Sequence, residues 1–208
     1  MPALAPPRIR AAGPADMDAV ARLTATAQVG NEIAHWLVGY DTERVRVYER
    51  YFDFVTPWFF EPDNAHGRRE VHMTEDGTGA ALWVHLDGKF GPDIADYDAR
   101  LRAACGLAVP RFITLDEVMY TNHPDGQPHA YLAFLSVAPH TQGTGVGSAL
   151  LKHMHQQLDA TGTPAYLEAT GPRCSRLYHQ HGYVIKRLLP LAPGGPYMRA
   201  MWRDPQPR

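Results

Sequence analysis

The feature that most constrains this chain is a glycine-rich turn between an apolar run and an amphipathic segment. The run from Ala130 to Val137 is short and apolar, which predicts a central strand buried on both faces. Glycines stand after it at positions 143, 145 and 147. The next segment predicts a helix, because apolar residues recur every fourth position: Val146, Leu150, Met154 and Leu158.

This turn has the properties of an anion site. Glycines remove side chains, so successive backbone N–H groups can converge on an anion. The helix adds its unpaired first amides and the positive end of its dipole, a combination that suits a pyrophosphate. The turn is not a P-loop, because Gly147 is followed by Ser148 and no lysine. It is not a dinucleotide fingerprint either, because that pattern places its third glycine one residue later and lacks Gln142.

The rest of the chain predicts a mixed α/β fold in one domain. Helical patterns fill most of the first half, and strand–turn–helix–strand–helix–strand follows. Further strands are expected at 9–12, 69–74, 80–86, 165–169, 183–189 and 197–202. Further helices are expected from Pro14, around 33–40, from Asp41 to Val55, at 93–105, at 113–121 and from Pro172 to Gly182.

Composition excludes several classes of protein. The 208 residues carry a formal net charge of −2 and no run of Lys or Arg, which argues against nucleic-acid and membrane-surface partners. Cys105 and Cys174 are far apart, so neither a disulfide framework nor a zinc knuckle is indicated. No signal peptide and no segment of membrane-spanning length is visible, so we expect a soluble, cytoplasmic protein.

The turn and its neighbours resemble the GNAT superfamily of acetyltransferases. Gln142, Gly145 and Gly147 match the cofactor signature Arg/Gln-x-x-Gly-x-Gly/Ala, and the resemblance is continuous from about Ala130 to Val184. Around the signature, family-like segments stand at 135–139, 166–170 and 177–183. The resemblance implies a central mixed, mostly antiparallel twisted sheet flanked by helices, with a splayed pair of strands that holds acetyl-CoA.

The resemblance also implies an organisation. One domain would span 9–202, with an acceptor-side half at 9–128 and an acetyl-CoA-binding half at 129–202, between tails at 1–8 and 203–208. Within the superfamily, the chain resembles the subgroup containing puromycin N-acetyltransferase, in its Gly-Thr-Pro-Ala-x-Leu-Glu strand, its Pro-Arg before a helix and its Gly-Pro turn. One departure is Cys174, where the family often places an asparagine that contacts the cofactor arm.

Cofactor-binding residues follow from the resemblance. The backbone of Leu135, Ser136 and Val137 would pair with the pantetheine arm. The amides that would hold the pyrophosphate are those of Gln142, Gly143, Thr144, Gly145, Val146, Gly147 and Ser148. Arg173 and Arg176 would meet the 3′-phosphate, although solvated helix arginines are the commoner case.

Tyr178 is the candidate general acid. Cys174, Leu177, Tyr178 and His181 fall on one helix face, which predicts that this face meets the sheet. A tyrosine with a pKa of about 10 stays protonated at neutral pH, and a thiolate of pKa about 8.5 can accept its proton or hydrogen bond. The alternative is a core tyrosine that is packed for its ring.

Glu168 is the second candidate catalytic residue, because a carboxylate among apolar strand residues is costly. It could take a proton from the acceptor amine, bind the ammonium as a counter-ion, or point to solvent at a strand end. No metal site is expected, because His153 and His155, like His179 and His181, are two residues apart and point to different sides of a helix.

The first half of the chain is rich in aromatic residues, which at helical spacing are core more often than pocket. A wall of such rings would nevertheless suit a large flat or apolar amine. They are Trp36, Tyr40, Tyr48, Tyr51, Phe52, Phe54, Trp58, Phe59 and Phe60. Nearby acidic residues could attract a cation: Glu32, Asp41, Asp53 and Glu61.

The leading functional hypothesis is an N-acetyltransferase that moves an acetyl group to a small-molecule amine by direct attack. Cys174 is disfavoured as a covalent nucleophile, because its helix face is packed and no histidine base is implied beside it. The alternatives are acetylation of a peptide or protein amine, and a non-catalytic module that senses acyl-CoA. We expect a monomer or homodimer.

Overall fold

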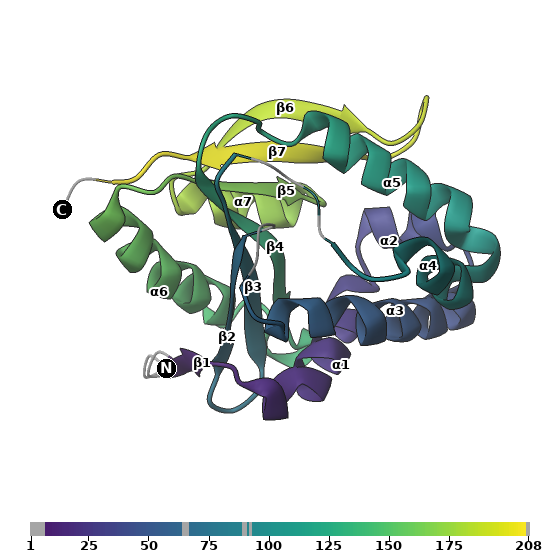
Figure 1. Ribbon diagram of the computed structural model, residues 1–208, viewed down its shortest axis with the longest axis horizontal. Coiled ribbons are helices and arrows are strands. Elements are labelled where there is room, and N and C mark those ends of the chain that lie inside the picture. The colour runs from purple at the N-terminus through teal and green to yellow at the C-terminus, as the bar shows by residue number, and fades with distance from the viewer. Residues whose placement is uncertain (1–6, 64–66, 89–90, 92, 207–208) are drawn as a thin grey trace.

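The protein is built on one twisted sheet. The computed structural model describes residues 7–63, 67–88, 91 and 93–206. In that part of the chain seven strands lie in the order β1-β2-β3-β4-β5-β7-β6 (Figure 1). Neighbouring strands are antiparallel except β4 and β5. The strands are β1 (Ile9–Ala11), β2 (Arg68–Thr74), β3 (Gly79–Leu86), β4 (His129–Val137), β5 (Ala165–Ala169), β6 (Val184–Pro190) and β7 (Tyr197–Arg203).

Helices cover both faces of this sheet, because side chains along each strand alternate between the faces. On β3, Ala80, Leu82 and Val84 belong to the core formed with the first five helices. Ala81 and Trp83 belong to the core formed with the last two. The helices are α1 (Met17–Gln28), α2 (Glu32–Leu37), α3 (Asp41–Val55), α4 (Tyr97–Cys105), α5 (Val109–Asn122), α6 (Val146–Thr161) and α7 (Pro172–Gln180). The predicted class, a mixed and mostly antiparallel sheet flanked by helices, is confirmed.

β4 and β5 separate along their length, and this separation positions the site. They pair only at Ala130 with Ala165 and at Tyr131 with Tyr166, although β4 continues to Val137. On its other side β4 carries a bulge, because Phe134 pairs with Leu82 and Leu132 with Trp83, which leaves Ala133 as the extra residue. A bulge bends the strand that carries it. The two strand edges beyond Tyr131 therefore diverge, as the predicted splay requires.

Several boundaries differ from those expected. α4 begins at Tyr97 and not at residue 93, after Asp96 in a left-handed conformation. α5 begins at Val109, four residues early, because Pro110 suits a first helical turn. β7 includes Arg203, which the sequence placed in a loose tail. This side chain is 4% exposed and binds Asp159 at 2.7 and 2.8 Å. Residues 1–6 and 207–208 of the predicted tails lie outside the described residues.

Candidate active site

The glycine turn connects β4 to the first turn of α6. Gly143 and Gly145 have φ values of +85° and +98°, a region in which side-chain-bearing residues are strained. Gly145 is the N-cap of α6. Gly147 has a different role, because a Cβ there would lie 3.3 Å from Cδ2 of Leu177. Two glycines thus shape the turn, and the third lets α6 approach α7.

The amides of Gly143, Gly145 and the first turn of α6 are placed for an anion, whereas those of Gln142 and Thr144 donate to the carbonyls of Pro139 and Thr141 at 3.4 and 3.3 Å. The first N–H groups of a helix have no partner within it. Among the described residues, backbone pairing at the start of α6 begins where Ala149 N–H donates to the Gly145 carbonyl at 3.0 Å. Four residues of the turn line a cavity: Gly143, Gly145, Gly147 and Ser148. Their setting at the positive end of α6 suits a phosphate group.

The free edge of β4 forms the adjoining wall. Ser136 is fully buried, on the face of the sheet that it shares with Ala80, and it is outside the cavity lining. The backbone carbonyls of Leu135 and Val137, on either side of it, point to the free edge of β4. Successive residues of a strand direct their backbone hydrogen-bonding groups to opposite sides. There the Leu135 carbonyl accepts from Gln28 Nε2 at 3.2 Å, and the Val137 carbonyl accepts from Gln142 Nε2 at 3.3 Å. Leu135, Val137 and Gln142, which the resemblance assigns to cofactor binding, line the cavity.

Two further predicted cofactor residues do not line the cavity. The Thr144 hydroxyl donates to the Thr141 carbonyl at 2.7 Å on the exposed side of the turn. The Val146 side chain is buried in the core, where its Cγ1 atom lies beneath Gly79. With Ser136, they are the only predicted site residues outside the cavity lining. Their backbone positions alone remain candidates for contact with a cofactor.

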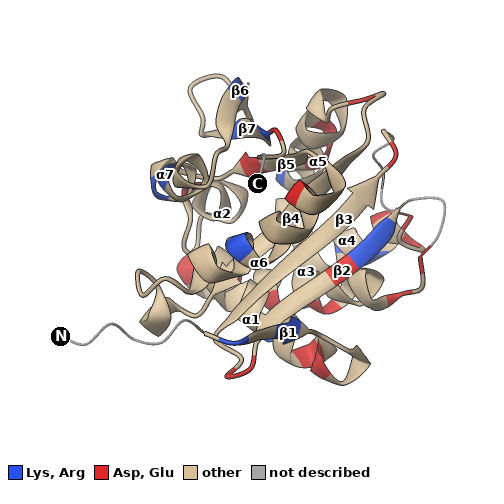
Figure 2. Ribbon diagram, turned by 90° about the vertical axis from the view of Figure 1, so that its left-hand side faces the viewer, with Lys and Arg blue, Asp and Glu red and all other residues tan. Residues whose placement is uncertain are grey.

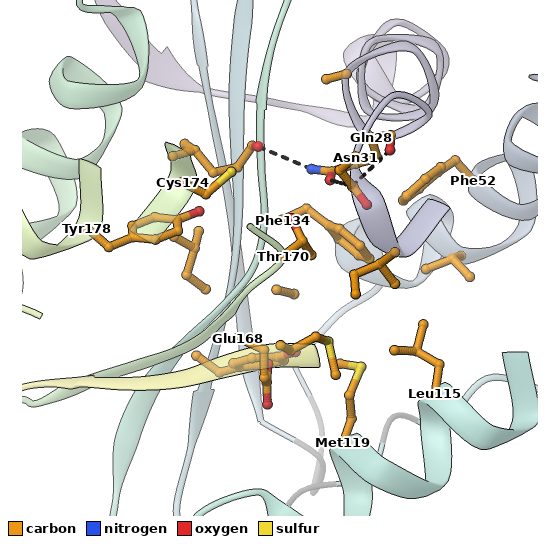
Figure 3. Close-up of a pocket in the computed structure, with 18 of the residues that line it drawn as sticks. Gln28, Asn31, Phe52, Leu115, Met119, Phe134, Glu168, Thr170, Cys174 and Tyr178 are labelled. Atoms are coloured by element: carbon orange, nitrogen blue, oxygen red, sulfur yellow. Dashed lines mark hydrogen bonds between the residues drawn. The ribbon is translucent and has the colours of Figure 1, made fainter. Parts of the chain in front are cut away.

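The cavity is continuous from the glycine turn to the aromatic helices of the first half. Its volume is about 830 Å³, within the range of sites for small molecules and cofactors. Figure 3 shows Tyr178 and Cys174 on one side, Gln28 and Phe52 across from them, and Met119 and Leu115 of α5 beyond Glu168. The cavity therefore joins the predicted cofactor half to the predicted acceptor half.

Tyr178 lies on α7 and is 8% exposed. Its ring packs edge-on against Tyr183 at a centroid distance of 5.8 Å, and its hydroxyl points toward the cavity (Figure 3). Burial, with smaller contributions from Cys174 and Tyr183, holds the pKa of Tyr178 well above its usual value. The hydroxyl therefore stays protonated at neutral pH and can donate a hydrogen bond into the cavity.

Glu168 lines the same cavity from β5, and its side chain is 3% exposed. The predicted alternative in which it points to solvent is therefore wrong. Its Oε1 atom lies 3.8 Å from Nδ1 of His123. Proximity of this carboxylate raises the pKa values of Tyr131 and Tyr166, after the larger effect of burial. An incoming ammonium would offset the cost of burying this carboxylate.

Arg173 and Arg176 line the rim of the cavity from α7. Both are exposed, and in the described part of the chain neither forms an ion pair. Figure 2 shows basic residues on α7. From this position both arginines could bind a phosphate at the mouth of the cavity. Two solvated arginines without a ligand would have the same positions.

The acceptor end is lined by aromatic rings from α3, α5 and the segment after α3. Five of these are Tyr48, Tyr51, Phe52, Trp58 and Phe59. The expectation for nearby acidic residues is wrong, because none of Glu32, Asp41, Asp53 and Glu61 lines the cavity. Asp116 of α5 does, and it accepts a hydrogen bond from the Tyr97 hydroxyl at 2.8 Å. Burial raises the pKa of Asp116 to about 6.

Sequence reasoning missed several residues of this site. Gln28 and Asn31 end α1 and begin α2, and the Asn31 side chain caps α2 by accepting from Ala34 N–H at 2.9 Å. Asn31 before a helical stretch is a recognisable capping signal, but its place beside the cavity is not. Asp116 carried no local signal, because its partner Tyr97 comes from another helix. Neither did His123, which lies behind Glu168 and outside the cavity lining.

The described residues contain no group of three or more His, Cys, Asp or Glu side chains that could hold a metal ion. Instead, His153 packs on His72 at a ring distance of 4.7 Å, and His155 bonds the Tyr183 hydroxyl at 3.1 Å. None of the described helices combines the length and apolar character needed to cross a bilayer.

Comparison with known proteins gives one family and one fold. Residues 106–185 match the family model described as an acetyltransferase (GNAT) domain. A Corynebacterium glutamicum structure described as histone acetyltransferase HPA2 and related acetyltransferase is 24% identical, with 98% of this chain and 99% of that chain covered and a TM-score of 0.69.

Two further structures share the fold. Arylalkylamine N-acetyltransferase 2 from Aedes aegypti is 16% identical, with 96% of this chain and 99% of that chain covered and a TM-score of 0.58. The PaiA N-acetyltransferase from Thermoplasma acidophilum, solved with coenzyme A, is 11% identical, with coverages of 95% and 98% and a TM-score of 0.57. The chain thus shares the fold of these structures, and residues 106–185 match a GNAT acetyltransferase domain. The match supports an N-acetyltransferase enzyme, of a class that takes the acyl group from acetyl-CoA.

Proposed function

We propose that this enzyme transfers the acetyl group of acetyl-CoA to the primary amine of a small, largely apolar molecule. The observation that carries the proposal is the single cavity that the glycine turn and the aromatic wall share. One end offers backbone donors to a diphosphate, and the other offers apolar surface and two carboxyl groups. An amine and a thioester can meet between these ends.

The residues at the first end fit coenzyme A. Amides of the turn would hold the pyrophosphate, and the free β4 edge at Leu135 and Val137 would pair with the pantetheine arm. The Gln28 side-chain amide donates to the Leu135 carbonyl. When the pantetheine arm binds, Gln28 would share this carbonyl with it or give it up. Arg173 and Arg176 would meet the 3′-phosphate. The bound cosubstrate supplies an activated acetyl thioester.

The acceptor end favours a small molecule over a peptide. Rings from α3 and α5 enclose it, and Figure 1 shows these helices lying over one end of the sheet. A peptide substrate would require a shallow groove for its backbone. Apolar and aromatic lining suits an amine with a ring or alkyl group, while Asp116 and Glu168 suit its ammonium.

We assign the chemistry to two side chains. Only a neutral amine attacks a thioester, so a base must take the ammonium proton, and Glu168 is the buried carboxylate in the cavity. The Tyr178 hydroxyl would donate to the leaving sulfur. Cys174 also lines the cavity but serves as wall, because the amine attacks directly and no acyl-enzyme is formed.

We also infer membership of the puromycin N-acetyltransferase-like subgroup. Support comes from the Gly-Thr-Pro-Ala-x-Leu-Glu stretch, which places Glu168 in the cavity. An antibiotic or a related metabolite with a primary amine is the corresponding acceptor class. Puromycin is therefore one of the amines to be tested.

The test is a thiol-release assay with acetyl-CoA and a panel of acceptors. The panel contains phenethylamine, tyramine, puromycin, a polar diamine and short peptides with free N-termini. We expect turnover with an aromatic amine and kcat/KM at least about tenfold lower for the peptides, a difference of about 1.4 kcal/mol in transition-state binding.

Calorimetry with coenzyme A separates the remaining outcomes. Coenzyme A binding without turnover on any amine would favour an acyl-CoA sensor. Preferred turnover of peptides would replace the small-molecule assignment with a peptide one. Failure to bind coenzyme A would remove the proposal altogether.

A further inference from the structure

A line of polar side chains runs from the cavity to the turn before β4. Glu168 Oε1 lies 3.8 Å from His123 Nδ1, and His123 Nε2 lies 3.0 Å from His129 Nε2. His129 Nδ1 lies 2.7 Å from the backbone carbonyl oxygen of Gln127. His123 is 8% exposed and His129 is 1% exposed. We call Glu168, His123 and His129 the acid–histidine line.

The hydrogen positions in this line follow from its two ends. The Gln127 carbonyl can only accept, so Nδ1 of His129 carries a hydrogen. Nε2 of a neutral His129 is then an acceptor, and His123 must donate to it from its own Nε2. Nδ1 of a neutral His123 then faces the carboxylate with a lone pair. Two neutral imidazoles therefore supply two hydrogens for three contacts.

A third proton completes the line and also neutralises it. One carboxylate and two neutral imidazoles carry a charge of −1, which is costly among buried residues. An added proton between His123 and Glu168 gives a carboxylate–imidazolium pair, or a neutral acid and imidazole, with a net charge of zero. The line is therefore built to take up one proton from the cavity.

The surroundings support uptake and retention of that proton. Tyr131 of β4 and Tyr166 of β5 each stack edge-on with the His123 ring at 4.8 Å, and Trp202 of β7 lies 5.5 Å from the His129 ring. Among the described residues, Arg187 of β6 interacts with Tyr166 and Asp116 of α5 interacts with Tyr131, and both tyrosine hydroxyls also interact with the Glu168 carboxylate. Burial lowers the pKa of His129, which keeps this ring neutral at the far end.

We propose that Glu168, His123 and His129 act as one proton-accepting unit that takes the proton of the acceptor ammonium. In the step, the N–H bond of the ammonium breaks and its proton passes to the Glu168 carboxylate and on to Nδ1 of His123. The neutral amine then forms the C–N bond as the C–S bond breaks; the leaving sulfur takes the proton of the Tyr178 hydroxyl, and the second N–H proton of the amine restores that hydroxyl. Glu168 is the catalytic residue, and His123 and His129 are positioning residues that raise its capacity to hold the proton.

The 3.8 Å separation defines what must move. It is an ion-pair distance, about 1 Å longer than a hydrogen bond, so a small rotation of either side chain or one bridging water closes it. This inference rests on the proposed function for the identity of the proton donor. The coupling between Glu168 and the two histidines exists without any substrate, so it can be tested separately.

The first experiment measures that coupling by NMR on the full chain with ¹⁵N-labelled histidine. We expect the Glu168→Gln variant to change the ¹⁵N chemical shift of His123 Nδ1 at neutral pH, because the group 3.8 Å from this nitrogen changes from a carboxylate to an amide. His155 serves as an internal control, since it bonds Tyr183 in the other core. An unchanged His123 Nδ1 shift would overturn the proposal, whatever amine the enzyme uses.

The second experiment measures the pH dependence of kcat/KM with the best amine of the panel. His123→Asn should lower kcat/KM about tenfold near neutral pH and shift the acidic limb by about one unit, while coenzyme A affinity is unchanged. His155→Asn is the matched control and should leave the limb in place. A loss that is the same at every pH would show that His123 acts only in packing and would overturn the proposal.

Discussion

Asp116 is a carboxyl group that weakens the fold at neutral pH, and Asp116→Asn measures the effect. It lies on α5 against the cavity, where the Tyr97 hydroxyl donates to it at 2.8 Å. Burial raises its pKa from 3.8 to about 6, and the carboxylates of Asp98 and Glu117 add to the shift. The Tyr97 hydrogen bond opposes the shift but does not cancel it.

The size and sign of the effect follow from linkage. In the folded protein this carboxyl holds its proton at pH values where the unfolded chain has lost it. Stability is therefore highest below the unfolded pKa, falls as pH rises from about 4 to about 6, and stays low above that. A shift of about two units corresponds to about 3 kcal/mol, as an upper limit for a side chain that is partly open to the cavity.

The assay is urea unfolding of the wild type and of Asp116→Asn at pH 4.5 and pH 8. An asparagine cannot ionise, so the variant should gain up to about 3 kcal/mol over the wild type at pH 8 and much less at pH 4.5. Asp53→Asn is the control, since Asp53 is exposed on α3 and outside the cavity lining. A stability difference that does not change with pH would refute the reasoning.

The same variant should bind its amine more weakly. An ammonium beside Asp116 would meet a carboxylate in the wild type and a neutral amide in the variant. We expect KM for the amine to rise about tenfold, about 1.4 kcal/mol, with coenzyme A affinity unchanged. An unchanged KM would place the ammonium elsewhere in the cavity.

Three further predictions concern the turn, the acid and the end of the sheet. Tyr178→Phe should lower kcat about a hundredfold and spare coenzyme A affinity; an unchanged rate would remove the acid role. Gly145→Ala should weaken coenzyme A binding about tenfold, because its φ of +98° is strained for alanine, whereas Gly39→Ala at an exposed position should not. Asp159→Ala should cost about 2 kcal/mol by unfolding, because Arg203 is left buried without its bidentate partner; equal stability would show that solvent replaces that partner.

Local patterns in the sequence were enough to predict the central elements of the fold. The apolar run at 130–137, the glycine turn and the fourfold spacing after it produce β4, the turn and α6 with nearly the expected bounds. These elements are determined by short-range rules, namely burial, chain flexibility and helical periodicity. The predicted start of α4 was wrong because Asp96 adopts a left-handed conformation. The predicted end of β7 was wrong because Arg203 pairs with Asp159, which is distant in the sequence.

The sequence also brought most of the candidate site together. Tyr178, Glu168, Arg173 and most of the cofactor turn line one cavity, because they belong to one continuous strand–helix unit. Ser136 shows the limit of that reasoning. The register of β4 against β3 decides which alternate residues face the free edge, and a bulge at Ala133 sets that register.

Only the tertiary structure decided the acceptor end and the acid–histidine line. Asp116 meets Tyr97 across two helices, and His123 meets Glu168 across α5 and β5. Such contacts depend on how whole elements pack, and a lone histidine or aspartate in sequence carries no record of its partner. The sequence by itself therefore determined the turn that we propose as the diphosphate site, while packing between distant elements determined the cavity that we propose for the amine and its proton.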